Sequence, residues 1–483
     1  MIYSLTCFLA VVMSGMPVSA DKVPSQSWMG MYFGRTKIGY ARFAIAKSVY
    51  EGRPGFKLDS SMIANVLVLG AKVDQDVENT VYLDTKFTPV YQVFKMSSAG
   101  HTTTVTARYS EDQIVAELDA EGAKTSKIIP IPPGGRIVGD SVFPTGNSKV
   151  NVGDVFDLRA FNPLTLTLES IRNEALCHER IELGGMATDA LVIKSTTSVG
   201  DITCWQDTNG EVLKAIVPMG ISMIREPKEV ALAVPQSHEQ RNYYPPSDLA
   251  VKAAMTVGAK ISDPRSVKYF KIQFKGITDR SLLIRDDRQK VSVYGRSPYT
   301  AEYEITASKI DPSKALDIPI QRDDVKEFLG ESAYVQPSNP EIASLAREIA
   351  GSEKNSARII SSIRAWVQSN MQVQGDVGIV RSSLDVLHTK TGVCRDYAIL
   401  YTALARSAGI PTKVVSGLVY WKGKLYYHAW AESFVGEWVP VDSTLDSDFV
   451  DATHVKFAEG DATSMFSIVK LMGSVDAIVL RFH

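Results

Sequence analysis

The sequence predicts a multidomain protein in which a large antiparallel β-rich N-terminal region precedes a C-terminal α+β domain. Two patterns in its 483 residues lead to this prediction. From about residue 28 to 230, short runs of strand-forming residues alternate with turn signals, which is typical of antiparallel strands. From about residue 320, apolar residues recur with helical spacing, and strands then follow the helices. A chain of this length can form two or three domains, each with its own core.

Composition and charge exclude some classes of partner. The chain is 45% hydrophobic and 22% charged, with a formal net charge of -2 and a pI near 6.4. No sustained cluster of Lys and Arg is interleaved with aromatic residues, so nucleic acid binding is not expected. The composition is that of an ordinary globular protein.

Residues 1–20 are expected to be a secretory signal peptide that is cleaved near Ala20. Residues 2–18 form the one long apolar stretch, and Gly15 and Pro17 interrupt it before the small residues that precede the cleavage site. The stretch lacks a leading Lys or Arg, but it is short for a membrane span. No later segment is apolar enough to span a bilayer. The mature protein is therefore expected to be secreted or periplasmic, without a stable membrane span.

Residues 21–233 are predicted to form the antiparallel β-rich domain, either open and curved or closed into a barrel or sandwich. Asn209-Gly210 lies between two strand-like runs and is a strong hairpin signal. His101 and His178 have no partners at ligand spacing and are expected to be surface histidines. Cys177 and Cys204 could form a disulfide outside the cytoplasm, and two buried free thiols are equally compatible with the sequence.

Residues 234–262, rich in proline and tyrosine, are predicted to be a linker, and residues 263–318 a small β-rich segment. The C-terminal domain is predicted over residues 319–483. Asn339 followed by Pro340 is a helix start, and Asn355 is predicted to cap the next helix. Strands are expected from about residue 414 to 442.

Cys394 begins a third predicted helix, which is apolar on most sides and ends at Gly409 and Pro411. A thiol in the first turn of a helix lies near unpaired N–H groups and the positive end of the helix dipole. Both effects favour the thiolate and so lower the pKa of a cysteine. A lone cysteine is nonetheless more often a small buried hydrophobic residue, so its partners decide its role.

His428 and Asp442 lie on two successive predicted strands and are the candidate partners of Cys394. A thiolate that attacks an amide needs a base, and the base needs a third group to orient it. For Asp442 to lie opposite His428, the hairpin must centre on Val435, which a three-residue loop over residues 434–436 satisfies. A two-residue turn at residues 435–436 would place Asp442 on the wrong face unless a bulge intervened. We therefore predict an odd-length loop or a bulge.

Three motifs in one order resemble the transglutaminase-like core superfamily. They are G-V-C-R-D-Y-A with L-A-R-S-A-G-I-P-T after it, then Y-H-A-W-A-E-S, then W-V-P-V-D-S-T, and the resemblance covers about residues 340–445. It implies a papain-like fold in which Cys394 is the nucleophile, His428 the general base and acid, and Asp442 the residue that orients the histidine. Tyr397 and Trp430 are candidates for the substrate cleft, although packing in the core is favoured for both.

No cofactor is expected, and the resemblance implies no metal requirement. Asp446, Asp448 and Asp451 could be read as a calcium loop, but the glycine and the terminal glutamate of such a loop are missing, so this alternative is disfavoured.

Together these features predict a secreted cysteine-nucleophile enzyme that acts on amide bonds of proteins or peptides through a thioester. Transfer to water would make it a peptidase or amidase, and transfer to an amine a cross-linking enzyme; the sequence leaves both open. The alternative is a catalytically silent binding or scaffold protein of the cell envelope. The sequence does not indicate an oligomeric state.

Overall fold

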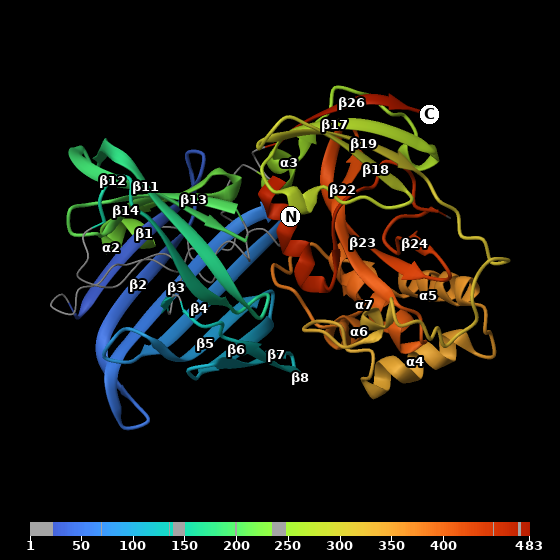
Figure 1. Ribbon diagram of the computed structural model, residues 1–483, viewed down its shortest axis with the longest axis horizontal. Coiled ribbons are helices and arrows are strands. Elements are labelled where there is room, and N and C mark those ends of the chain that lie inside the picture. Colours follow the sequence, from blue (N-terminus) through green and yellow to red (C-terminus); the bar gives the residue numbers. More distant parts are fainter. Residues whose placement is uncertain are drawn as a thin grey trace.

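The computed structural model of the chain describes residues 23–68, 70–134, 136–138, 150–198, 200–233, 248–447, 449–471 and 475–483 (Figure 1). A broad curved sheet forms the N-terminal half, and a mixed α+β body forms the C-terminal half. The two-part fold class predicted from the sequence is therefore confirmed. The predicted signal peptide and the first part of the predicted linker, residues 234–247, lie outside the described residues.

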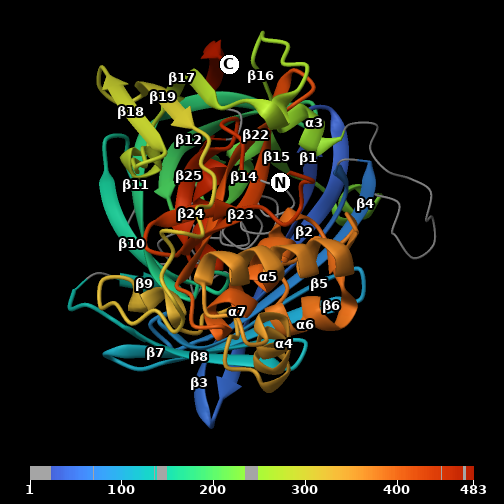
Figure 2. The ribbon, with the colours of Figure 1, turned by 90° about the vertical axis from the view of Figure 1, so that its right-hand side faces the viewer.

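The N-terminal half is one fifteen-stranded sheet in the order β8-β7-β6-β5-β4-β3-β2-β1-β15-β14-β13-β12-β11-β10-β9. Among the described residues β8 and β9 are its two edges, so the sheet is open and curved (Figure 2). The strands are β1 Ser25–Phe33, β2 Thr36–Tyr50, β3 Arg53–Val68, β4 Ala71–Leu83, β5 Pro89–Ser98, β6 His101–Tyr109, β7 Gln113–Ala120, β8 Ala123–Pro130, β9 Arg136–Val138, β10 Val155–Asn162, β11 Thr167–Leu183, β12 Met186–Thr197, β13 Gly200–Gln206, β14 Val212–Val217 and β15 Ile221–Arg225.

Several strands are longer than the short runs predicted, since β3 has 16 residues and β11 has 17. The predicted hairpin at Asn209-Gly210 is confirmed by the pairing of β13 with β14. Cys177 is exposed and Cys204 is buried, and both thiols are free. The structure therefore has no bridge between them, and the alternative of two buried free thiols holds for Cys204 but not for Cys177.

The C-terminal half packs helices against a second sheet, whose order is β16-β23-β22-β25 with β24 also paired to β23. Asn339 and Asn355 cap their helices through side-chain oxygens, as predicted. The helices are α4 Pro340–Ala350, α5 Ser356–Asn370, α6 Ser383–Thr389 and α7 Cys394–Ser407, and the strands are β16 Met255–Thr256, β22 Thr412–Trp421, β23 Lys424–Phe434, β24 Trp438–Val441 and β25 Val455–Gly460.

A third sheet joins the predicted small β-rich segment to the end of the chain. Its order is β18-β19-β17-β26, with strands β17 Tyr269–Ile277, β18 Gln289–Tyr294, β19 Tyr299–Thr306 and β26 Asp476–Phe482. The residues just before this sheet, within the predicted linker, contribute α3 Leu249–Ala253 and strand β16 of the second sheet. Both segments are thus integrated into the C-terminal body.

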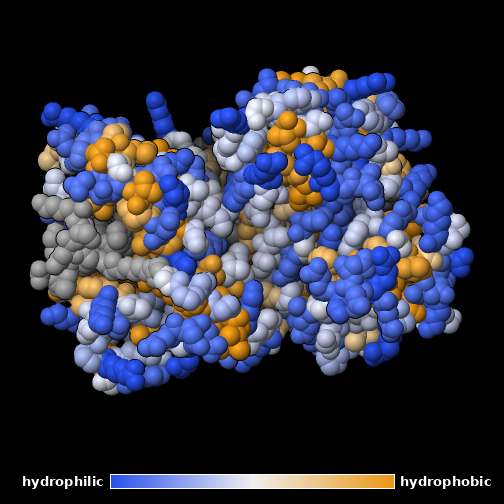
Figure 3. All heavy atoms as spheres, in the orientation of Figure 1, coloured by the Kyte–Doolittle hydropathy of each residue, from blue (hydrophilic) through white to orange (hydrophobic). Residues whose placement is uncertain are grey.

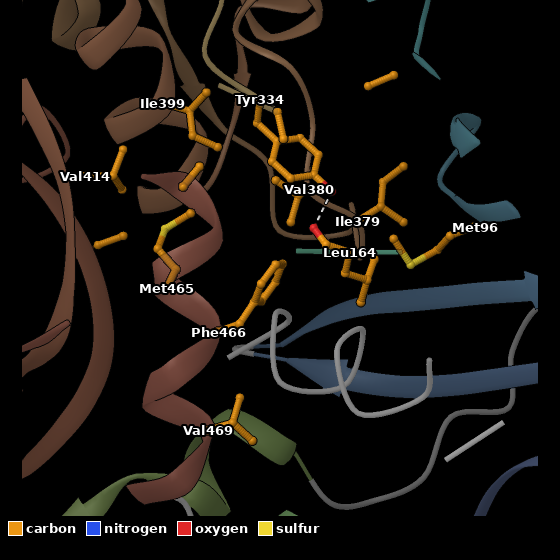
Figure 4. Close-up of a cluster of buried hydrophobic side chains, with 14 of the residues drawn as sticks. Met96, Leu164, Tyr334, Ile379, Val380, Ile399, Val414, Met465, Phe466 and Val469 are labelled. Atoms are coloured by element: carbon orange, nitrogen blue, oxygen red, sulfur yellow. Dashed lines mark hydrogen bonds between the residues drawn. The ribbon is translucent and has the colours of Figure 1, made fainter. Parts of the chain in front are cut away.

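The two halves share one hydrophobic core. Met96 of β5 and Leu164 after β10 lie in the same buried cluster as Ile379, Val380 and residues of the 3-10 helix η6, Ala462–Leu471 (Figure 4). The hydroxyl of Tyr334 donates to the carbonyl oxygen of Leu164 across this boundary. On the outer face seen in Figure 3, hydrophobic residues are scattered among hydrophilic ones over both halves. The N-terminal sheet is therefore packed on the C-terminal body through buried contacts.

Polar contacts cross the same boundary. The Gly378 N–H donates to Ser98 Oγ at 2.9 Å, and a Cβ at Gly378 would lie 2.7 Å from a methyl group of Val73. His101 is a satisfied histidine near the surface, as expected: 17% of its side chain is exposed, and its Nδ1 lies 3.2 Å from Asp385 Oδ2 of helix α6. Asp385 lies far along the chain, so spacing in the sequence could not reveal it. His178 is exposed, as expected.

No helix in the described part of the chain combines the length and apolar character that crossing a bilayer requires.

The shared core predicts a specific loss of stability. Phe466 of η6 is 2% exposed in this core, so Phe466→Ala removes many contacts and leaves a cavity. We expect the free energy of unfolding to fall by about 3–5 kcal/mol, measured by urea denaturation with far-ultraviolet circular dichroism. Val373→Ala is the control, since Val373 is 77% exposed. Equal unfolding curves for the two variants would contradict the shared core.

Candidate active site

Cys394 is the first residue of helix α7, as predicted from the sequence. The Asp396 carboxylate accepts a hydrogen bond from the Val393 N–H at 2.9 Å and so closes the first turn. The helix ends before Gly409, whose φ of 84° suits the left-handed conformation of a helix C-terminus. The thiol is partly buried and lies at the positive end of the helix dipole.

A buried ion network anchors this first turn. Arg395 Nε donates to Asp396 Oδ1 at 2.8 Å, and Arg381 lies 3.5 Å from Asp396 Oδ2. Arg381 also lies 3.8 Å from Asp385, the partner of His101. A Cβ at position 392 would lie 2.5 Å from Asp396, so only glycine fits there. Contacts among these buried charged side chains therefore restrain the first turn of α7, which begins at Cys394.

The thiol meets strand β23 at a gap in the edge of the sheet. At its outer edge β23 pairs with β16 at residues 424–425 and with β24 at residues 431–434. Among the described residues no strand covers the edge between these two pairings. Cys394 reaches this edge, where it is hydrogen-bonded to His428 and to the backbone of Ala429. The interrupted edge gives the helix terminus access to the histidine.

The hairpin between β23 and β24 has an odd-length loop, as predicted, but its register differs from the predicted one. Phe434 pairs with Trp438 and Ala431 with Val441, which leaves residues 435–437 as the loop. Continued by one step, this register places Asp442 beside Trp430, two residues along β23 from His428. The predicted loop over residues 434–436, centred on Val435, is therefore wrong by one residue, and the turn centres on Gly436. Because the loop has odd length, Asp442 still lies on the same face as His428 and reaches it diagonally.

His428 Nε2 lies 2.7 Å from Asp442 Oδ2, so the structure brings the predicted pair into hydrogen-bond contact. The other carboxylate oxygen, Oδ1, accepts the backbone N–H of Thr444 at 2.7 Å and that of Leu445 at 3.3 Å. Arg364 of α5 donates to the Asp442 carbonyl oxygen at 2.9 Å. With Nε2 facing Asp442, the remaining ring nitrogen, Nδ1, is left for the thiol.

The three groups shift one another's protonation. Burial opposes ionisation of the Cys394 thiol, but the charge and hydrogen bond of His428 outweigh it and lower the pKa of the thiol. Burial also opposes the charge on His428, but Asp442 and Cys394 raise its pKa to about 10. The pKa of Asp442 is held well below its usual range, despite burial, by His428 and His454. These directions favour a thiolate–imidazolium pair at neutral pH.

Tyr397 and Trp430, the two candidates for a substrate cleft, are both buried. Trp430 lies over Gly417 of β22, where a Cβ would approach its ring to 2.7 Å. Its ring centroid is 6.1 Å from that of His428. Core packing, the favoured interpretation of both residues, is therefore what the structure shows. Trp430 also forms one wall around the histidine.

One residue at the site was missed from the sequence. His454, 1% exposed, lies with Nε2 3.3 Å from Asp442 Oδ2 and Nδ1 3.2 Å from Asp451 Oδ2. The neighbouring aspartates were considered only as a possible calcium loop. His454 is a single histidine without a recognisable motif, so the sequence did not indicate a role for it.

Two clusters in the described chain have the donor atoms of a metal site. The imidazoles of His428 and His454 lie with Asp442, and the carboxylates of Asp286, Glu432 and Glu459 form the other group. In the second cluster the Lys456 ammonium already lies among the carboxylates, 2.8 Å from Glu432. In the first, the donor atoms hydrogen-bond one another.

The disfavoured calcium loop gains no support. Asp446 is exposed, and Asp448 lies outside the described residues. The Asp451 carboxylate is held by Thr453 at 2.5 Å and by Arg265 at 2.8 Å.

Two hollows of about 630 and 320 Å³ lie on the N-terminal sheet, and none of the three site residues lines them.

Comparisons with known proteins place this site in a family. Residues 343–443 match the transglutaminase-like superfamily. An uncharacterised protein of Mycobacterium leprae is 30% identical over 177 residues, which cover 32% of this chain and 62% of that protein. The chain thus spans less than two thirds of that relative.

Two solved structures resemble the chain more weakly. A candidate cysteine protease from Cytophaga hutchinsonii is 20% identical, with a TM-score of 0.33 over 45% of this chain and 89% of that one. A candidate protease from Parabacteroides distasonis is 13% identical, with a TM-score of 0.21 over 79% of this chain and 66% of that one. At these TM-scores neither likeness bears on function. The family match is the informative comparison: the segment that it covers, residues 343–443, contains Cys394, His428 and Asp442 and is similar to the transglutaminase-like superfamily.

Proposed function

We propose that the protein is a cysteine-nucleophile enzyme that cleaves amide bonds of proteins or peptides through a thioester, outside the cytoplasm. The observation that carries the proposal is the contact of His428 with both Asp442, at 2.7 Å, and the thiol of Cys394. A nucleophile, a base and an orienting carboxylate in contact form the arrangement that acyl transfer requires. The location rests on the apolar stretch of residues 2–18.

In this mechanism the Cys394 thiolate attacks the amide carbon and forms a carbon–sulfur bond. As the tetrahedral intermediate collapses, the carbon–nitrogen bond breaks, and the His428 imidazolium gives its proton to the departing amine. A water molecule or a primary amine then attacks the thioester while His428 accepts a proton from it. The thiolate leaves, and the imidazolium is restored. Asp442 stays ionised throughout and holds the ring in one orientation.

The raised pKa of His428 matters for the first half of this cycle. A ring with a pKa of about 10 is protonated at neutral pH, so the acid needed by the leaving amine is present before attack. The same positive charge stabilises the thiolate. The pair therefore supplies a nucleophile and an acid together.

Thiol reactivity should report this pair. Iodoacetamide should alkylate Cys394 at pH values below the usual cysteine range, because His428 lowers the pKa of the thiol. In His428→Ala this stabilisation is lost, so the pH midpoint should rise and the rate at neutral pH should fall. The rate is measured by mass spectrometry of the Cys394 peptide, with Cys177→Ser in all variants because Cys177 is exposed.

His388→Ala is the matched control for this measurement. His388 is half exposed and pairs with Glu341. It should leave the pH profile of Cys394 unchanged. A His428→Ala profile that coincides with that of the control would contradict the ion pair.

Turnover of peptide amides tests the function itself. With the full chain and a library of glutamine-containing and other peptide amides, Cys394→Ala should reduce the rate by about 10⁴-fold or more, since it removes the nucleophile. Cys177→Ala is the control and should retain full activity. Adding a primary amine separates the two outcomes, because transfer yields an amine conjugate and hydrolysis yields a free acid. A wild-type chain as inactive as Cys394→Ala on every amide would favour the silent scaffold.

A further inference from the structure

The Asp442 carboxylate is shared by two buried histidines. Its Oδ2 atom lies 2.7 Å from Nε2 of His428 and 3.3 Å from Nε2 of His454. The two imidazole rings meet at 62° with their centroids 5.5 Å apart. The Trp430 ring lies 5.3 Å from His454 and excludes water from that side. One oxygen thus interacts with the proposed base and with a second ring that does not contact the thiol.

His454 is itself held at its other nitrogen. Nδ1 lies 3.2 Å from Asp451 Oδ2 and 3.3 Å from the Asp451 carbonyl oxygen. Arg265, which precedes β17, lies 2.8 Å from the same Asp451 oxygen. Arg288, which precedes β18, donates to the carbonyl oxygens of His454 at 2.9 Å and of Asp451.

The charged and titratable groups facing His454 are therefore Asp442 from the end of β24, Asp451 from its own loop, Arg265 behind Asp451, Arg288 at the backbone, and His428 from β23. The oxygen atoms that face the two ring nitrogens of His454 are acceptors, so the tautomer with a proton on Nε2 donates to Asp442, and Nδ1 donates as well only in a protonated ring. The ring, Asp451 and Asp442 are all buried, so these contacts lie in a low-dielectric environment.

We propose that His454, backed by Asp451 and Arg265, is a positioning residue that fixes the Asp442 carboxylate for His428. Asp442 is the first residue after β24, so no strand pairing holds its side chain. The backbone N–H groups of Thr444 and Leu445 restrain Oδ1, and His454 supplies the corresponding restraint at Oδ2. The supporting residues all lie outside residues 343–443, the segment that matches the superfamily.

The proposal rests on the proposed function, but its test measures thiol reactivity and needs no substrate. In a Cys177→Ser background, His454→Leu removes the donor to Asp442, whereas His454→Gln keeps an N–H group. We expect the neutral-pH alkylation rate of Cys394 to fall about tenfold in His454→Leu, with a higher pH midpoint, because a less restrained His428 stabilises the thiolate less. In His454→Gln the rate should stay within about threefold of the parent.

His388→Leu is the matched control, because it removes a histidine–carboxylate pair that is exposed and does not include Asp442. A higher alkylation rate in His454→Gln than in His454→Leu would show that the N–H group matters. If His454 only filled space, the two variants would not differ in this way. Three results would overturn the proposal: parental rates in both His454 variants, equal losses in both, or faster alkylation in His454→Leu. The last would mean that His454 competes with His428 for Asp442.

A second variant keeps the test decisive if His454→Leu does not fold. Asp451→Asn preserves the size of the side chain and an oxygen for Thr453, but it removes the charge that faces Nδ1 of His454. We expect alkylation to slow by about threefold or more. An unchanged rate would overturn the proposal. Normal thiol reactivity without turnover of any amide would instead count against the proposed function alone.

Discussion

The arrangement of the site depends on one hydrogen bond, between His428 Nε2 and Asp442 Oδ2. The odd-length loop at residues 435–437 brings Asp442 to the correct face of the sheet. Gly417 leaves space for the Trp430 ring beside His428. Arg364 and two backbone N–H groups restrain Asp442 from the helical side, and His454 restrains it from the opposite side. Each of these features acts on the orientation of one imidazole, whose other nitrogen is left for the thiol.

Cys394 is fixed by a different set of contacts. The buried Asp396 carboxylate joins the helix start to Arg395 and Arg381. Through Asp385 the same network continues to His101 of the N-terminal sheet. Since the two halves also share a hydrophobic core, the sheet and the nucleophile belong to one packed body. The N-terminal region is therefore part of the environment in which the cysteine helix starts.

Much of this organisation could be predicted from local sequence. Asn339, Asn355 and Gly409 mark helix boundaries through backbone geometry that a few neighbouring residues determine. The loop was predicted to contain an odd number of residues because His428 and Asp442 must lie on the same face of the sheet to meet. The register itself could not be predicted, because alternation is the same after a shift of two residues. In the structure the hairpin places Phe434 against Trp438, with ring centroids 5.4 Å apart. The role of His454 and the partner of His101 were missed because the groups they contact are close only after folding.

The pairing of β26 with β17 has a consequence for how the chain can be divided. The last strand lies in the sheet that begins near residue 269, so the C-terminal body is closed by two segments far apart in the sequence. A fragment that began at residue 319 would leave β26 without a neighbour and Asp451 without Arg265. It would also lose β16 from the edge of β23. The strands of the segment that matches the superfamily thus pair with strands outside it, and a site inherited with all its contacts would keep those flanking strands.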